Sequence, residues 1–339
     1  MSRRLKSYLF WIGALGIIFG FCRHKSFPAT LPWIFGWALI VVVTDRLVGG
    51  KHRRAARRKT EPLPKDPRLD TPGKVAAMLF NYQVSNLLIF LNPLLVIQVI
   101  LQLAGSCWEK SFGRPVLVAE QFQQHGTYIL PVAGEWRVFN GGVTQETSHS
   151  WGIPSQRFAY DLVKPGDNGR TFAGDGRRLT DYFCFDAPIL APADGVVVKV
   201  RDGIRDAPHV GTFWMDWLTR DIGGNSVLIR HAAGEYCLLA HLKRGSVCVT
   251  SGQTVKQGQE IGRCGHSGNS TEPHLHFQFQ NGKSFYFNSG LPVKFSGFWR
   301  GEGESRVWVE RDYICKGTMV AAVGAEAPNS KLQHPENLQ

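Results

Sequence analysis

The stretch GRCGHSGNSTEPHLHFQFQ, residues 262–280, decides the fold prediction. After Pro273 it alternates polar and apolar side chains, which is the period of a β-strand. Residues two apart on a strand point to the same face, so His274 and His276 can present two imidazoles to one site. Leu275 and Phe277 then face the opposite way. The pattern predicts a strand that carries a metal or catalytic site.

The surrounding chain predicts an all-β domain. Short β-branched and aromatic runs recur from Val116 to Val309, and Gly-containing turns separate them. No long amphipathic helical period interrupts them. We expect an all-β domain over residues 110–318. The tail over 320–339, rich in Ala, Pro, Asn and Gln, is expected to be disordered.

The positive charge of the chain lies in its N-terminal quarter. The formal net charge is +12. Residues 1–74 hold 15 basic and 4 acidic side chains, whereas the remaining residues hold 24 and 23. Because this excess flanks the most apolar segments, it indicates membrane topology rather than a nucleic-acid surface. A nucleic-acid arm at 51–74 is the alternative interpretation, and we expect no nucleic-acid partner.

Three apolar stretches are candidate membrane helices. Tyr8–Cys22 and Phe27–Val43 carry no charge, and Leu87–Ala104 ends a third apolar run. A helix needs roughly 20 residues to span a bilayer. We therefore expect two transmembrane helices within 1–48 and a third within 75–105, which would hold the chain in the lipid bilayer. A signal peptide is the alternative for the first stretch, but no small-residue cleavage site follows it.

The loop before the third stretch sets the predicted orientation. Nine of the 24 residues in 51–74 are basic, and cytoplasmic loops are enriched in Lys and Arg. We expect a basic, proline-containing cytoplasmic loop over 49–74. Three spans then place everything after Gly105 outside the cytoplasm, as in a multi-pass protein of the cell membrane. Six cysteines would lie in that oxidising compartment, either paired or as buried free thiols.

Two further residues fit a catalytic site with the HxH pair. His241 ends the strand-like run YCLLAHL, and Asp161 lies among apolar residues in QRFAYDLV. A catalytic zinc takes about three protein ligands from His and carboxylate and keeps one open position. The zinc ion then activates water and polarises the scissile carbonyl. Two further imidazoles can move protons and stabilise the oxyanion.

These segments together resemble the lysostaphin/LytM-type zinc metallopeptidase family. The resemblance covers Trp136 to Gln280. It rests on RFAYDL, PILAPADGVVVKV, GNSVLIRH, YCLLAHL and SGQTVKQGQEIGRCGHSGNSTEPHLHF, in that order. It implies a lysostaphin-like antiparallel β-domain of the duplicated-hybrid, barrel-sandwich type with a groove. It also implies hydrolysis of peptide bonds in bacterial cell-wall peptidoglycan, with zinc as the cofactor.

The resemblance also assigns roles to residues. Asp161 and His276 match metal ligands, and His241 and His274 match the two histidines that assist catalysis. The family's first ligand is a histidine four residues before the aspartate. That position is Arg157 in this chain, and a guanidinium cannot ligate zinc because it stays protonated.

Two hypotheses follow from Arg157. In the first, His149 supplies the third ligand from the strand-like segment TSHSWGI, with the neutral Gln156 as a poorer candidate. In the second, the domain has lost zinc and binds the wall, or activates or recruits a partner wall hydrolase. Retention of the aspartate and three histidines favours the first. A biotinyl or lipoyl carrier is a third class, but no lysine lies in the turn at Asp194-Gly195.

Overall fold

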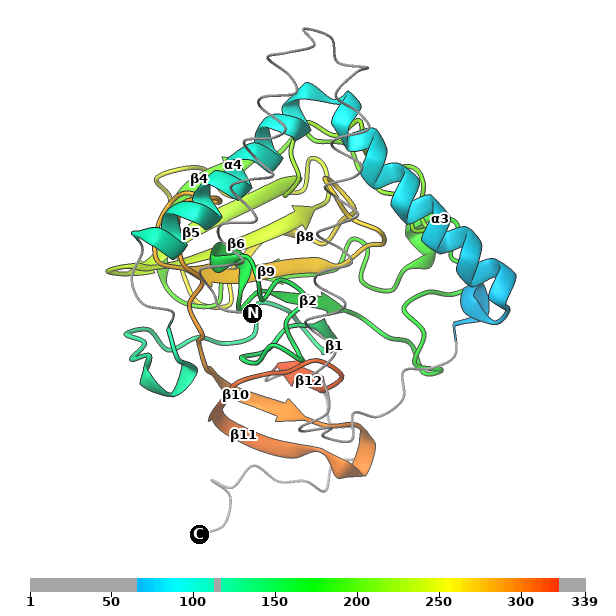
Figure 1. Cartoon of the computed structure of the whole chain (residues 1–339). Helices are drawn as coiled ribbons and strands as arrows, with labels where there is room; N and C mark the ends of the chain where they lie inside the picture. The colour runs from blue at the N-terminus through cyan, green and yellow to red at the C-terminus, as the bar shows by residue number, and fades with distance from the viewer. Residues whose placement is uncertain (1–65, 113–116, 323–339) are drawn as a thin grey trace, which may run out of the picture. The chain divides into compact units, whose positions relative to one another are not determined.

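The computed structural model describes residues 66–112 and 117–322, which form a sheet domain and two longer helices (Figure 1). The two membrane helices predicted within 1–48 lie outside the described residues. So do most of the predicted basic loop and the chain after residue 322.

The described domain is mostly antiparallel β-sheet, as predicted. Ten strands form one sheet in the order β11-β10-β12-β1-β2-β9-β6-β5-β4-β7, and β3 pairs with β8 in a second sheet. The strands are β1 (Glu135–Asn140), β2 (Tyr160–Val163), β3 (Pro188–Leu190), β4 (Gly195–Arg201), β5 (Asn225–Ala232), β6 (Glu235–Leu242), β7 (Thr254–Val255), β8 (Glu260–Arg263), β9 (Leu275–Gln280), β10 (Phe295–Arg300), β11 (Val307–Asp312) and β12 (Met319–Ala322).

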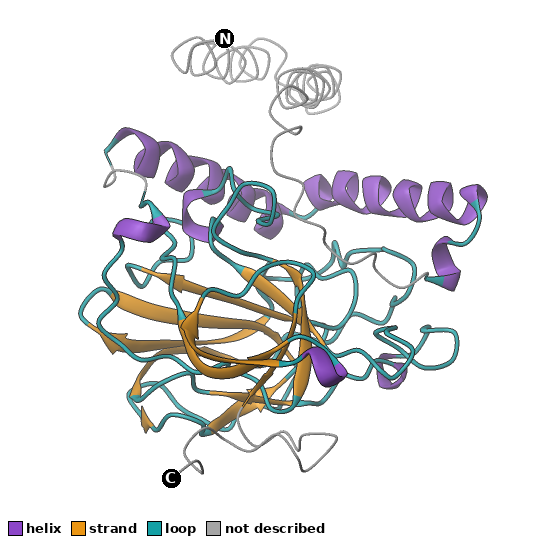
Figure 2. Ribbon diagram, turned by 90° about the horizontal axis from the view of Figure 1, so that it is seen from below, coloured by secondary structure: helices purple, strands orange, loops and turns teal. Residues whose placement is uncertain are grey.

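Helical structure is confined to two longer helices and short 3-10 turns in the described residues. The longer helices are α3 (Pro72–Leu88) and α4 (Pro93–Ser111). The 3-10 turns are η1 (Pro67–Leu69), η2 (Ile89–Leu91), η3 (Ala119–Gln121), η4 (Pro154–Gln156), η5 (Leu179–Asp181) and η6 (Gly303–Ser305). In the view of Figure 2, both longer helices lie along one side of the sheet domain.

The central strands place the HxH segment in the middle of the sheet. β9 pairs with β2 on one side and with β6 on the other. His276 therefore lies opposite Asp161 on β2 and opposite Ala240 on β6. Phe277 and Phe279 alternate with the polar residues of β9 and are buried in the main core. The period-two pattern thus separates the polar face of β9 from its core face.

The sequence predicts one helix within 75–105, whereas the structure has two helices there, α3 and α4. Asn92 has extended backbone angles, φ −103° and ψ 106°, and its side chain accepts a hydrogen bond from the Leu94 backbone N–H. Pro93 follows at the first position of α4, where its missing N–H costs nothing. The pair Asn-Pro therefore ends one helix and starts the next.

Of the described residues, only the helical stretch Pro72–Leu91 has the length and apolar composition needed to cross a membrane.

The predicted start of the tail at residue 320 needs correction. β12 extends to Ala322 and pairs with β1 and β10, so residues 320–322 belong to the sheet. The six described cysteines, Cys107, Cys184, Cys237, Cys248, Cys264 and Cys315, are all free thiols.

Candidate metal and catalytic site

Asp161 lies at the centre of the polar cluster. It is buried on β2, and its Oδ1 is 3.0 Å from His276 Nδ1. The same oxygen is 3.7 Å from His274 Nε2, and Oδ2 is 3.5 Å from His149 Nδ1. One carboxylate therefore faces three imidazoles, two of them from the predicted HxH pair.

His149 reaches this cluster from a turn, not from a strand. The structure places residues 149–152 in turns, which corrects the strand predicted for TSHSWGI. The reason is local, because hydrogen bonds such as Ile153 N–H to the Ser150 carbonyl close the segment. His149, Asp161 and His276 each offer one ligand atom, and these atoms all lie within 4.8 Å of one another. The side chain of His149 is 30% exposed, so the group is open to solvent on that side.

This donor set fits a catalytic zinc ion. Two imidazole nitrogens and one carboxylate oxygen are the types and number of protein ligands found at such sites. Gln156, the poorer candidate, points elsewhere, because its amide donates to Gln102 of α4 at 3.2 Å.

His241 borders the cluster on β6 and has an unusual backbone. Its φ is +60°, a left-handed conformation that is uncommon for residues other than glycine. Its Nδ1 is 2.7 Å from the Ser267 carbonyl oxygen, so Nδ1 donates and Nε2 is the unprotonated nitrogen of the neutral ring. The ring centroids of His241 and His274 are 4.8 Å apart. Residues with a positive φ such as that of His241 cluster at functional sites.

His274 is oriented through its other ring nitrogen. Its Nδ1 lies 2.8 Å from the Glu272 carbonyl oxygen and 3.2 Å from Ser270 Oγ. A proton on Nδ1 satisfies the carbonyl and leaves Nε2 facing Asp161. The structure therefore brings all five predicted site residues together.

Arg157 takes no part in the donor group. Its Nε donates to the Trp151 carbonyl oxygen at 3.1 Å, and its guanidinium lies 5.0 Å from the centroid of the Trp151 ring. It follows η4 directly, and its own carbonyl accepts a hydrogen bond from Ser148. The residue that replaces the expected histidine thus holds the turn that carries His149.

Burial and neighbouring charges act in opposite directions on the pKa values of Asp161 and His276. Burial alone raises the pKa of Asp161, but the hydrogen bond from His276 and the nearby imidazoles outweigh it and hold the pKa well below its ordinary value. Burial lowers the pKa of His276, but the hydrogen bond and charge of Asp161 raise it above its usual value. Burial lowers the pKa values of His149 and His241.

Three residues beside the site are absent from the sequence predictions. Asn140 Nδ2 donates to Asp161 Oδ2 at 3.0 Å, and Lys316 Nζ donates to Asn140 Oδ1 at 3.1 Å. Gln278 Oε1 lies 3.1 Å from His276 Nε2. Gln278 could have been found, because it continues the same-face pattern of His274 and His276. Asn140 carries no such signal, since only the pairing of β1 with β2 brings it close.

Asp161 and His276 on paired strands, with His149 from an adjacent turn, form a donor set typical of a zinc site on an antiparallel β-domain. Residues 179–287 match the model of Peptidase family M23. This match confirms the resemblance to lysostaphin/LytM-type peptidases over residues 179–287. Asp161 and His149 lie upstream of the matched residues.

Parts of the chain are similar to curated bacterial proteins. One alignment is 37% identical over 103 residues to the peptidoglycan DD-endopeptidase ShyC of Vibrio cholerae and covers 30% of this chain and 19% of that protein. Another is 46% identical over 92 residues to the DD-carboxypeptidase/endopeptidase Mpg of Neisseria meningitidis and covers 27% and 16%. The chain thus spans less than a fifth of the length of these relatives.

A solved structure with a similar chain is the catalytic domain of the antimicrobial peptidase lysostaphin from Staphylococcus simulans. The TM-score is 0.25 and the identity 18%, over 52% of this chain and 93% of that chain.

Proposed function

We propose that the protein is a membrane-anchored zinc metallopeptidase that hydrolyses peptide bonds in cell-wall peptidoglycan. The observation that carries this proposal is the convergence of His149, Asp161 and His276 ligand atoms within 4.8 Å. The substrate class rests on the match to Peptidase family M23 and on relatives named as peptidoglycan endopeptidases. The domain would act on the wall side of the membrane, with the N-terminal apolar segments as its anchor.

His149, Asp161 and His276 would hold the zinc ion. When bound, zinc supplies a Lewis acid for the scissile carbonyl and lowers the pKa of water. His241 is neutral at physiological pH because its pKa is low, so its Nε2 can accept the proton of the attacking water. His274 keeps its Nδ1–H on the Glu272 carbonyl; with a second proton taken up from solvent on Nε2, it can donate a hydrogen bond to the developing oxyanion.

The alternative is a zinc-free domain that binds the wall or recruits another wall hydrolase. The observation that favours it is Arg157 at the position of the family's first ligand. Against it, a binding module needs no solvent-accessible group of three metal donors beside two oriented imidazoles.

Metal analysis of the full-length protein separates these functions. We expect about one zinc per chain by mass spectrometry, lost in His149→Ala and in His276→Ala. His125→Ala is the matched control, because His125 is 70% exposed and pairs with Glu235 instead. Release of peptides from purified wall should fall with the zinc content. A protein that takes up no zinc when incubated with the metal would overturn the peptidase and support the binding module.

A further inference from the structure

We propose that α3 and α4 form an interfacial hairpin that lies flat on an anionic phospholipid bilayer, with the phosphate headgroups bound by a basic pocket beside α4. This inference rests on the membrane anchoring in the proposed function and is independent of zinc and catalysis. Two features carry it: the apolar outer face of the hairpin, and the cations that adjoin that face.

The outer face of the hairpin is mostly apolar. Of the 19 large apolar side chains exposed among the described residues, 13 lie between Leu69 and Phe112. Phe80 is 68% exposed, Ile97 is 53% and Ile100 is 57%. Residues 75–108 contain no Lys, Arg, Asp or Glu. A water-facing helix pair normally carries charges on its outer face, and a patch of this kind marks an interaction surface.

The inner face of α4 is bound to the sheet domain by polar contacts. Gln98 is 8% exposed; its amide donates to the Arg220 carbonyl at 2.9 Å, and its Oε1 accepts from the Ile222 backbone at 3.0 Å. The hydroxyl of Tyr286 also lies 3.1 Å from this oxygen. A helix surrounded by lipid could not keep these contacts, so α4 lies beside the domain and does not cross a membrane away from it.

Both ends of α3 are tied to the same domain. Arg68, just before α3, pairs with Glu272 at 3.1 Å and donates to the Tyr182 hydroxyl at 2.7 Å. Asn92, just after η2, donates to the carbonyls of Trp217 and Thr219. A spanning helix puts its two ends on opposite sides of a bilayer about 30 Å thick. The stretch Pro72–Leu91 therefore lies along the domain while these contacts hold.

The sequence upstream of the hairpin selects a bilayer as the occupant of the outer face. Residues 8–22 and 27–43, outside the described structure, are uncharged and apolar and are predicted to insert into the membrane. The run 51–59, upstream of the hairpin, holds six Lys or Arg residues, and such runs bind anionic headgroups. At the far end of α4, Trp108 and Phe112 are 55% and 74% exposed. Aromatic side chains are typical of the interfacial layer.

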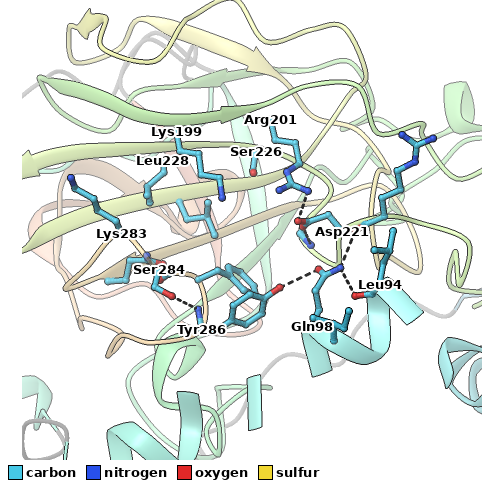
Figure 3. Close-up of a pocket in the computed structure, with 16 residues that line it drawn as sticks. Leu94, Gln98, Lys199, Arg201, Asp221, Ser226, Leu228, Lys283, Ser284 and Tyr286 are labelled. Atoms are coloured by element: carbon cyan, nitrogen blue, oxygen red, sulfur yellow. Dashed lines mark hydrogen bonds and ion pairs between the residues drawn. The ribbon is translucent and has the colours of Figure 1, made fainter. Parts of the chain in front are cut away.

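A pocket of about 400 Å³ joins the apolar face to a cationic surface (Figure 3). Leu94 and Ile97 of α4 form its apolar side, and Lys199 and Arg201 of β4 lie across from them. Arg220 and Lys283 complete the cationic lining. Arg201 is neutralised by Asp221 at 2.6 Å.

The other three cations have no ion pair within the described part of the chain. Lys199, Arg220 and Lys283 are also exposed. Exposed cations beside an apolar surface match the chemistry of an anionic phospholipid, whose phosphate and acyl chains meet at the same depth.

This arrangement excludes the three-span topology, because the hairpin no longer crosses the bilayer. Residues 60–65 and the C-terminal tail then lie on the same side of the membrane. For a wall-side domain, the basic run 51–59 would lie opposite to the side that the Lys and Arg bias predicts. Topology is therefore the decisive measurement.

The first experiment inserts a protease site into residues 60–65 or 323–339 of the full-length chain in sealed membrane vesicles. Cleavage of both sites from the same side is expected. Cleavage from opposite sides would overturn the interfacial hairpin. If both sites face the cytoplasm, the hairpin stands and the wall-hydrolase function fails, so the two failures are distinguishable.

The second experiment uses vesicles of phosphatidylglycerol and phosphatidylethanolamine that contain a photoreactive acyl chain. Crosslinks are expected at Phe80, Ile97 and Ile100, and absent from the inward Leu95 and Gln98. Crosslinks on all sides of α4 would show a lipid-surrounded helix and overturn the proposal. If no hairpin residue crosslinks to lipid and two copies of the chain crosslink to each other, a second copy covers the outer face. That result would also overturn the proposal.

The third experiment tests the pocket with a photoreactive phosphatidylglycerol headgroup. Each surface cation contributes about fivefold in affinity for an anionic leaflet. Reversing two of them, Lys199→Glu with Lys283→Glu, should lower headgroup crosslinking at least tenfold. The matched control reverses Arg230 and Arg311, two exposed cations outside the pocket, and should leave it unchanged. An equal loss of headgroup crosslinking in both variants would show that surface charge in general, and not this pocket, binds the headgroups, and would overturn the assignment of the pocket.

Discussion

Gln278 Oε1 accepts a hydrogen bond from His276 Nε2 at 3.1 Å, and this contact determines which nitrogen of the His276 ring carries the proton. The amide nitrogen of Gln278 is already used, because it donates to Gln280 Oε1 at 2.7 Å and to the Ser155 carbonyl at 3.2 Å. Gln278 therefore presents its oxygen to His276, and Nε2 must carry the proton. That leaves Nδ1, which faces Asp161, as the nitrogen available to a metal.

Loss of this acceptor should weaken zinc binding. In Gln278→Leu, the His276 ring loses the partner that holds its tautomer and orientation, and we expect roughly 10- to 100-fold lower zinc affinity. Competition with a chromophoric chelator measures the change. Gln278→Glu, which still offers an oxygen, is the matched control and should lose less. Unchanged affinity in the leucine variant would show that Gln278 does not position His276.

Zinc affinity should rise with pH through the titration of His276. Without a metal, both ring nitrogens donate, Nδ1 to Asp161 and Nε2 to Gln278, which is why the pKa of His276 is raised above 6.5. Zinc must displace the Nδ1 proton, so acid competes with the metal below that raised pKa and no longer does so above it. Zinc titrations at pH 6 and pH 8 should therefore give the weaker affinity at pH 6. Equal affinities would contradict the assignment of His276 as a ligand.

Arg157→Ala should reduce stability and leave zinc stoichiometry unchanged at saturating metal. The variant loses a hydrogen bond and a cation–π contact with Trp151, worth together about 1–2 kcal/mol of unfolding free energy. Urea denaturation of the full-length protein in detergent measures this loss. A gain of zinc affinity above tenfold would instead show that the guanidinium repels the metal from the native site.

Arg68→Ala should destabilise the segment that precedes α3. The Arg68 and Glu272 side chains are 12% and 15% exposed, and the guanidinium also lies 4.1 Å from the Phe172 ring centroid. Removing the arginine leaves a nearly buried carboxyl without its cation, at a cost of about 3 kcal/mol. Arg68→Lys keeps the charge and should recover part of the loss. A denaturation midpoint unchanged in Arg68→Ala would rule out this anchor.

His266 should make the protein less stable in acid. It is fully buried, and burial lowers its pKa to about 4 from an ordinary 6.5. The unfolded chain then binds more protons between these two values, so stability is complete above pH 6.5 and falls as the pH drops toward 4. The loss between pH 7 and pH 5 is about 2 kcal/mol.

Denaturation midpoints of His266→Asn at the two pH values check this assignment. The pH-dependent loss should shrink by that amount in the variant, whereas His209→Asn, at an exposed histidine, should behave like the native chain. The same slope in all three proteins would assign the acid sensitivity to other groups.

Periodicity predicted the parts of the site that lie on one strand. The HxH segment shows its facing directly in sequence, since alternation separates His274 and His276 from the buried phenylalanines. The alternation around Asp161 is imperfect and does not decide which face it occupies; its pairing opposite His276 follows from the register of β2 and β9. A register joins segments more than a hundred residues apart, which no local pattern encodes.

The turn at His149 and the break at Asn92 show where local patterns mislead. TSHSWGI has the residues of a short strand, but hydrogen bonds between nearby backbone groups close it into turns that put His149 beside Asp161. Residues 75–105 have the composition of one membrane helix. Composition does not reveal that Gln98 is bonded to the sheet domain, because hydropathy averages over both faces of a helix.

The contacts of Gln98 also decide which fragments of the chain keep the hydrogen bonds between the hairpin and the sheet domain. A fragment cut to begin at Gly105 would lose Asn92 and Gln98, and the backbone groups of Trp217, Thr219, Arg220 and Ile222 that they bind would lose their partners. The stretch 179–287 that matches the family model is thus hydrogen-bonded to chain that lies ahead of it. A fragment that keeps these contacts has to start ahead of Asp66, with the hairpin carried along as part of the folded domain rather than as a removable tether.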